Sequence, residues 1–75
     1  MRVRVKLMGV LKDKSPEGGR LDLPDGSTVE QALQALEIAV PSVHAVSING
    51  TFERDFARIL EAEDELAVLA PVGGG

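Results

Sequence analysis

The sequence closes with Leu66-Ala67-Val68-Leu69-Ala70-Pro71-Val72-Gly73-Gly74-Gly75, an apolar run followed by proline, valine and three glycines. Glycine has no Cβ, so a run of glycines is slender and conformationally free. Such a segment can enter a tunnel too narrow for other side chains. The group it would carry there is the α-carboxylate of Gly75. The alternative is a frayed end or a cloning remnant, since both concentrate at termini.

Size and composition favour one small folded domain. The chain has 75 residues, of which 44% are hydrophobic and 27% charged, and this balance is that of a folded protein rather than a disordered one. The absence of cysteine excludes disulfides, thiolate metal sites and thiol nucleophiles. No apolar run approaches the roughly 20 residues that span a bilayer. We therefore expect a cytoplasmic protein without a deep active site.

The net charge of −4 is unevenly distributed. Most basic residues precede Leu21, whereas the acids are densest over residues 61–65. Nucleic-acid binding is disfavoured, because it requires a basic surface and stacking aromatics. A protein partner fits better, although many of these charges can simply be solvated.

One helix is predicted in the middle of the chain. Ser27 and Glu30 are spaced as a capping box, in which each side chain accepts a hydrogen bond from the other residue's amide. Apolar residues then follow at helical spacing, and Pro41 makes continuation beyond residues 37–38 improbable. The stripe consists of Val29, Ala32, Leu33 and Leu36.

Alternation of apolar and polar residues predicts strands over residues 2–7, 21–23, 43–48, 51–52 and 66–70. Residues 9–19 are rich in turn formers and are expected to make a hairpin loop. Asn49-Gly50 is a strong signal for a two-residue turn, which requires positive φ at both positions. One apolar face per element predicts a shared core of Val3, Val5, Leu7, Leu21, Leu23, Val29, Leu33, Leu36, Val46, Ile48, Leu66 and Val68.

This order of elements predicts an α+β fold with a mixed sheet of four to five strands packed on one helix. A single helix covers only one sheet face. Ala67 and Leu69 are expected on the other face, where an apolar patch just before the glycines suggests a partner.

The segment Asp25–Val29, the turn Ile48-Asn49-Gly50 and the ending Leu69–Gly75 are similar to the MoaD/ThiS family of ubiquitin-like sulfur carriers. The similarity extends over essentially the whole chain. It implies a β-grasp domain over residues 1–70 and a flexible tail over residues 71–75.

The resemblance also implies a function. In that family, an adenylyltransferase resembling ubiquitin-activating enzymes uses ATP to adenylate the terminal glycine, and sulfur then replaces AMP to give a thiocarboxylate. Gly75 would be the modified residue and Gly73 and Gly74 its slim neighbours. The carrier would be a monomer that binds no cofactor or metal and is not itself an enzyme; at most it is a small subunit of a molybdopterin-synthase-like complex. A sulfur-accepting synthase subunit would be the second partner. The expected partner surface comprises Arg4, Lys6, Ala67, Leu69, Pro71 and Val72.

No catalytic group is evident in the sequence. His44 is the single histidine and is interpreted as a surface or packing residue. The acids Glu61, Glu63, Asp64 and Glu65 are interpreted as a solvated turn, because consecutive residues alternate in direction and do not converge on a metal.

Three departures from the family pattern stand out. Glu63-Asp64-Glu65 replaces the usual Gly-Asp-Glu, Ala70 precedes Pro71 where proline is common, and Glu37 occupies the place of a glycine after the helix. These changes predict an altered turn before the last strand.

Three functions remain open. The first is a sulfur carrier in cofactor biosynthesis, with molybdopterin ahead of thiamine thiazole. The second is a ubiquitin-like modifier joined to lysines through Gly75, or a carrier for tRNA thiolation. The third is an interaction domain with an inert tail.

Overall fold

The central element is strand β5 (Glu65–Leu69), which lies between β1 (Arg2–Met8) and β3 (Ala45–Ile48). The structure, a computed structural model, describes residues 1–71. β1 and β5 are parallel, and all other strand pairs are antiparallel. The sheet order is β2-β1-β5-β3-β4, with β2 (Arg20–Asp22) and β4 (Thr51–Glu53) at the edges. The predicted mixed sheet is confirmed.

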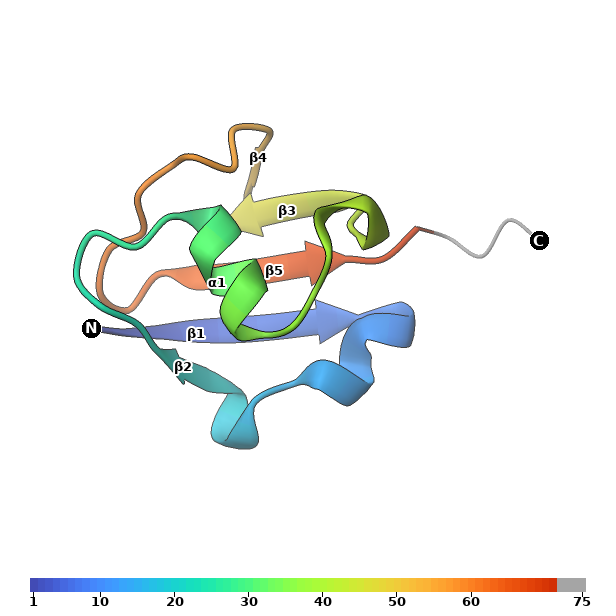
Figure 1. The fold of residues 1–75 in the computed structure, drawn as a ribbon, viewed down its shortest axis with the longest axis horizontal. Coiled ribbons are helices and arrows are strands. Elements are labelled where there is room, and N and C mark those ends of the chain that lie inside the picture. The colour runs from blue at the N-terminus through green and yellow to red at the C-terminus, as the bar shows by residue number, and fades with distance from the viewer. Residues whose placement is uncertain (72–75) are drawn as a thin grey trace.

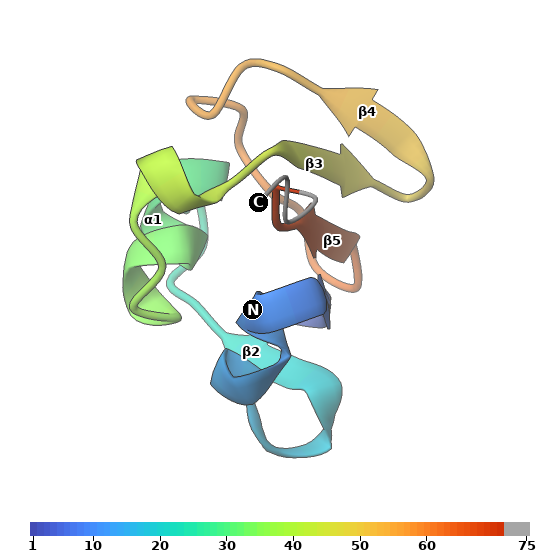
Figure 2. The same cartoon turned by 90° about the vertical axis from the view of Figure 1, so that its right-hand side faces the viewer.

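Helix α1 (Val29–Ala35) covers one face of this sheet. Figure 2 shows α1 on one side of the sheet, while none of the described elements covers the other side. Burial alternates along β1, so that Val3, Val5 and Leu7 point toward α1. The predicted core is confirmed, with Leu21 only half-buried at its margin. The core placement of the helix stripe, Ala32 included, is also confirmed, and three further core residues were not predicted: Leu11, Ile38 and Leu60.

The predicted hairpin is confirmed, since β1 and β2 are antiparallel neighbours, but its connection is not an irregular loop. Residues Gly9–Lys14 form a 3-10 helix (η1), and Glu17–Gly19 form a second short turn of this type (η2). Leu11 is only 4% exposed. Burial of this one side chain explains why the connection folds onto the domain instead of extending into solvent.

The predicted N-cap is displaced by one residue. Thr28 is the N-cap, its hydroxyl accepts from the Gln31 amide at 3.2 Å, and the Gln31 side chain accepts from the Thr28 amide at 2.8 Å. Ser27 instead donates from its hydroxyl to the Pro24 carbonyl at 2.7 Å. Serine and threonine can both serve as N-caps. The Ser27 hydroxyl is bonded within the turn at Pro24, so Thr28 caps the helix instead.

Two glutamates adopt the left-handed conformation usual for glycine. Glu37 has a φ of 60° directly after α1, where the Ile38 amide reaches the Leu33 carbonyl at 2.9 Å. This pattern is a Schellman motif. Glu63 has a φ of 68° in the turn before β5. Glu63 thus takes a conformation that glycine adopts readily, and the predicted change of this turn relative to the family stays a prediction.

The hairpin turn is confirmed, with φ values of 53° at Asn49 and 88° at Gly50. The prediction of a solvated acidic turn is wrong for Asp64, which is 9% exposed. Its carboxylate accepts from the Glu61 amide at 2.8 Å and from Nδ2 of Asn49 at 2.9 Å. Asp64 is therefore a structural residue.

Candidate functional site

The candidate site lies at the C-terminal end of β5, where the glycine-rich tail begins. After β5, the chain passes through Ala70 to Pro71, between η1 and the 3-10 turn η3 (Val40–Ser42) (Figures 1 and 2). The amide of His44 donates to the Leu69 carbonyl at 2.8 Å. On the other flank, Gly9 lies close to Ala70, since a Cβ added at Gly9 would come within 3.4 Å of Cβ of Ala70. The chain is thus held on both sides up to the point where the tail begins.

Val72 and Gly73–Gly75 lie outside the described residues. The expectations for the tail and for a modified Gly75 therefore stay predictions. Pro71, at the start of the tail, is exposed.

The sheet face opposite α1 presents a partly apolar surface. The pairs Met8–Leu69 and Ala45–Leu69 form one row across it, and Lys6, Ala67, Ser47 and Phe52 form the next. Residues paired directly across strands share a face. Phe52 is 71% exposed, Met8 is 38% exposed and Leu69 is half-buried. We call this surface the exposed sheet face; its members are Arg4, Lys6, Met8, Ala45, Ser47, Phe52, Ala67 and Leu69.

Ala67 was expected to expose apolar area at the centre of the partner surface, and this expectation is wrong. Ala67 faces away from α1 as predicted, but it is only 8% exposed. It lies on the central strand between Lys6 and Ser47, and their longer side chains shield its single methyl group. The apolar contribution comes instead from Leu69 with Met8 and Phe52.

The sequence analysis missed Met8 and Phe52. A signal for Phe52 was present, because a two-residue turn at Asn49-Gly50 places Thr51 opposite Ile48 and Phe52 opposite Ser47. Since Ile48 is a core residue, Phe52 must point away from the core. Met8 continues the outward series that starts at Arg2.

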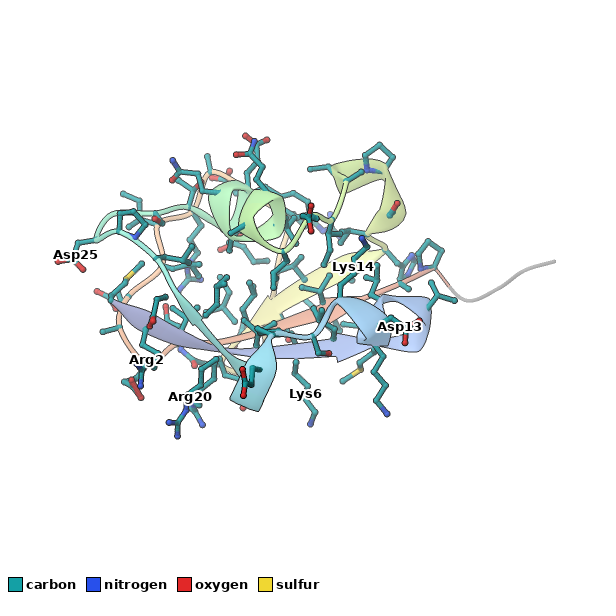
Figure 3. The ribbon with its side chains drawn as sticks, turned by 60° about the horizontal axis from the view of Figure 1, so that its bottom comes forward. Arg2, Lys6, Asp13, Lys14, Arg20 and Asp25 are labelled. Atoms are coloured by element: carbon teal, nitrogen blue, oxygen red, sulfur yellow. The ribbon has the colours of Figure 1, made fainter. Side chains whose placement is uncertain are left out.

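Basic residues border this face along β1 and β2. Figure 3 shows Arg2, Lys6 and Arg20 pointing away from the side of α1. Arg2 is engaged with Asp22 at 3.0 Å, and this hydrogen bond and charge raise the pKa of Arg2. Arg4 lies 3.8 Å from Glu65. Lys6 has no ion pair among residues 1–71, and it is therefore the more available of the two basic residues predicted to meet a partner.

The other candidate groups do not converge on a reactive centre within residues 1–71. His44 is exposed, and no three His, Asp or Glu side chains of this region could hold a metal ion together. Glu53 lies 3.0 Å from Arg58, and the pKa of Glu53 is lowered, chiefly by the hydrogen bond from Arg58. No helix in the described part of the chain is long and apolar enough to cross a membrane.

Comparison with solved structures supports the fold. SAMP1 from Haloferax volcanii is 25% identical, with a TM-score of 0.76 and 100% of both chains covered. A structure of H. volcanii small archaeal modifier protein 1 is also 25% identical, with a TM-score of 0.72, covering 95% of this chain and 98% of that one. These neighbours share the ubiquitin-like β-grasp architecture with this chain.

Comparison with curated sequences gives a relative from Arabidopsis thaliana, the molybdopterin synthase sulfur carrier subunit. It is 34% identical over 61 residues, which are 73% of this chain and 62% of the relative. The chain thus spans less than two thirds of that relative's length. The model of the ThiS family matches residues 5–75, nearly the whole sequence, and this chain accordingly belongs to the ThiS family.

Proposed function

We propose that this protein is a sulfur carrier that works through the α-carboxylate of Gly75. The observation that carries the proposal is the position of the glycine-rich segment. It follows the central strand of a ThiS-family β-grasp domain, at an end where Leu69 and Ala70 are held on both sides. A relative at 34% identity is itself a sulfur carrier subunit, which supports the same role here.

The chemistry requires activation by a partner. A carboxylate is a poor electrophile, because its charge is delocalised over two oxygens. We propose that an ATP-dependent adenylyltransferase lets this carboxylate attack the α-phosphorus of ATP, which releases pyrophosphate and leaves an acyl-adenylate. A sulfur nucleophile then attacks the acyl carbon and displaces AMP, which leaves a thiocarboxylate. The carrier binds no ATP in this scheme, and it contributes no catalytic residue.

The sulfur acceptor we favour is a molybdopterin synthase subunit. The Arabidopsis relative is a subunit of molybdopterin synthase, and this favours molybdopterin over the thiazole of thiamine. The chain would then be the small subunit of such a complex and would leave catalysis to its larger partner.

We propose the exposed sheet face as the docking surface for these partners. Leu69 and Met8 supply apolar area beside the start of the tail, and Phe52 adds to this face from the edge strand β4. Lys6 borders this area without an ion pair in the described structure. An unpaired basic residue at the rim would steer an acidic partner and raise the encounter rate more than the affinity.

The proposal is tested by incubating the purified protein with an adenylyltransferase from the same organism, ATP and a sulfide donor. The intact mass should rise by about 16 Da, since one sulfur replaces one oxygen after activation for nucleophilic attack. The rise should require ATP. An unchanged mass, with the adenylyltransferase active on another carrier, would contradict the proposal.

A second function is favoured by the likeness to small archaeal modifier protein 1, whose name describes a protein modifier. Gly75 would then form an isopeptide bond with lysines of other proteins. A ladder of higher-mass conjugates in cells, lost when Gly75 is deleted, would support this function. A tRNA-thiolation role would instead appear as loss of thiolated tRNA bases in a deletion strain.

A further inference from the structure

Exposed apolar side chains surround the end of β5, and some of them lie outside the exposed sheet face. Residues 1–71 contain five large hydrophobic residues that are exposed, and three of them belong to segments at this end: Met8 pairs with Leu69, Val10 lies in η1 and Val40 in η3. Single exposed apolar residues are ordinary on a protein surface. A group of them around one point is typical of a contact surface.

Val10 and Val40 each lie next to or near a residue that packs on the core, and both remain exposed themselves. In η1 the neighbouring Leu11 is buried and anchors the segment, whereas Val10 is 83% exposed. Val40 is 41% exposed, and the half-buried Val43 packs on the core in its place. Val10 therefore exposes apolar area that contributes little to the stability of the free protein, and Val40 leaves a smaller part of its surface exposed.

The position of these residues is tied to the tail. Figures 1 and 2 show η1 and η3 on either side of the end of β5. Gly75 lies four residues after Pro71 in the sequence, and four residues span at most about 13–14 Å. A protein that reacts with Gly75 must therefore approach within that distance of Pro71. At that range it faces both η1 and η3.

We propose that Val10, Val40 and the exposed Pro41 form a collar that packs against the adenylyltransferase, around the opening that admits the tail. This inference rests on the proposed function and extends it to a second surface. The collar lies on η1 and η3, outside the strands that carry the exposed sheet face. The partner would thus contact the carrier on two sides of β5 and fix the direction in which the tail enters.

The structure also indicates the chemistry of the partner surface. To bury Val10 and Val40, the rim of the opening in the adenylyltransferase must be apolar. Lys12 and Lys14 lie in the last turn of η1, next to Asp13. Neither lysine takes part in any of the ion pairs among residues 1–71. The rim should therefore carry carboxylates opposite η1.

The test compares Val10→Asp and Val40→Asp with Ile59→Asp. Ile59 is 59% exposed and pairs with Thr28 beside the start of α1, so it is a matched apolar residue far from the tail. Pyrophosphate release is measured against carrier concentration, with purified adenylyltransferase from the same organism. Both collar variants should raise KM about tenfold or more with kcat nearly unchanged, as expected for residues that contribute to docking. Ile59→Asp should stay within about twofold of the unmodified protein.

A charge variant gives an independent readout. Lys14→Glu should raise KM at low salt, and the difference should shrink as ionic strength rises. Circular dichroism of each variant establishes that it is folded.

Two results would overturn the collar. One is equal KM values for the collar variants and Ile59→Asp; the other is a collar effect confined to kcat. If the unmodified protein releases no pyrophosphate at all, the proposed function itself is wrong and the collar loses its partner. Pyrophosphate release with the unmodified protein therefore distinguishes an error in the collar proposal from an error in the proposed function.

Discussion

Asn49 in the β3–β4 turn donates from Nδ2 to Oδ1 of Asp64, 2.9 Å away, although 15 residues separate them in the sequence. Oδ1 of Asn49 also accepts from the Glu65 amide at 2.9 Å. These bonds join the hairpin turn to the start of the central strand. They therefore help to fix the register of β5, which leads to the tail.

Removal of this link should destabilise the protein. Asn49→Gly deletes the side chain without straining a residue at positive φ, and it leaves the carboxylate of Asp64 without one of its donors. We expect a loss of about 1–3 kcal/mol in the free energy of unfolding. Urea denaturation of Asn49→Gly, Asp64→Ala and the double variant measures the coupling. Strict additivity of the two single effects would show that the bond contributes nothing of its own.

Glycine at position 37 or 63 should stabilise the fold. Both glutamates have positive φ, which is costly for a residue with a Cβ. We expect Glu37→Gly and Glu63→Gly each to raise the free energy of unfolding by about 0.5–1 kcal/mol. The matched control is Glu30→Gly in the regular part of α1, which should lower it by about 1 kcal/mol. A lower melting temperature for both variants would contradict the left-handed geometry.

Acid should abolish the contribution of Glu53. The hydrogen bond from Arg58 lowers the pKa of Glu53 in the folded protein, so this contribution is complete above the ordinary glutamate pKa. It is lost as pH falls through the lower folded value. Glu53→Gln should therefore melt below the unmodified protein at pH 7, and the two should converge once the pH has fallen below the lowered pKa of Glu53. An equal difference at both pH values would contradict this assignment. Arg58→Met should reduce the difference and leave the part that comes from the Asp55 amide, which also donates to the Glu53 carboxylate.

Charge on the exposed sheet face should weaken partner binding without unfolding the domain. Leu69→Glu and Phe52→Glu place a carboxylate beside the tail or on the exposed edge strand. We expect each to reduce kcat/KM for adenylation by about tenfold or more. Thr51→Glu is the control, since Thr51 is exposed on the same strand but pairs with Ile48 and has the opposite orientation. Normal adenylation of both variants would place the docking surface elsewhere.

Most of the fold could be predicted from local patterns. Val3, Val5 and Leu7 alternate with charged residues, and Val29 and Leu33 recur at helical spacing, so each element reveals its buried face on its own. Leu11 was missed because turn-forming residues surround it, and only contact with the rest of the domain makes it a core residue. Local sequence does not record such contacts.

The candidate site was predicted less completely, since exposure depends on strand order. Ala67 is shielded because β5 is central, and this follows from pairing with β1 and β3 across long sequence separations. The sequence does not show that Val10 and Val40 belong to one surface, because this follows from the position of η1 and η3 on either side of the end of β5. The family resemblance, in contrast, was carried by short motifs, and the match over residues 5–75 confirms it.

The proposed function depends on the α-carboxylate of Gly75. Deleting Gly75 leaves Gly74 with an equally good carboxylate, set back by up to about 3.3–3.6 Å of extended chain. A displacement of even about 1 Å can slow such a reaction about a hundredfold.

The most direct test is the intact mass of the unmodified and Gly75-deleted proteins after incubation with the adenylyltransferase, ATP and a sulfide donor. We predict a gain of about 16 Da in the unmodified protein and conversion of the deletion variant at about one hundredth of the rate or less. Equal conversion of the two proteins would contradict the account.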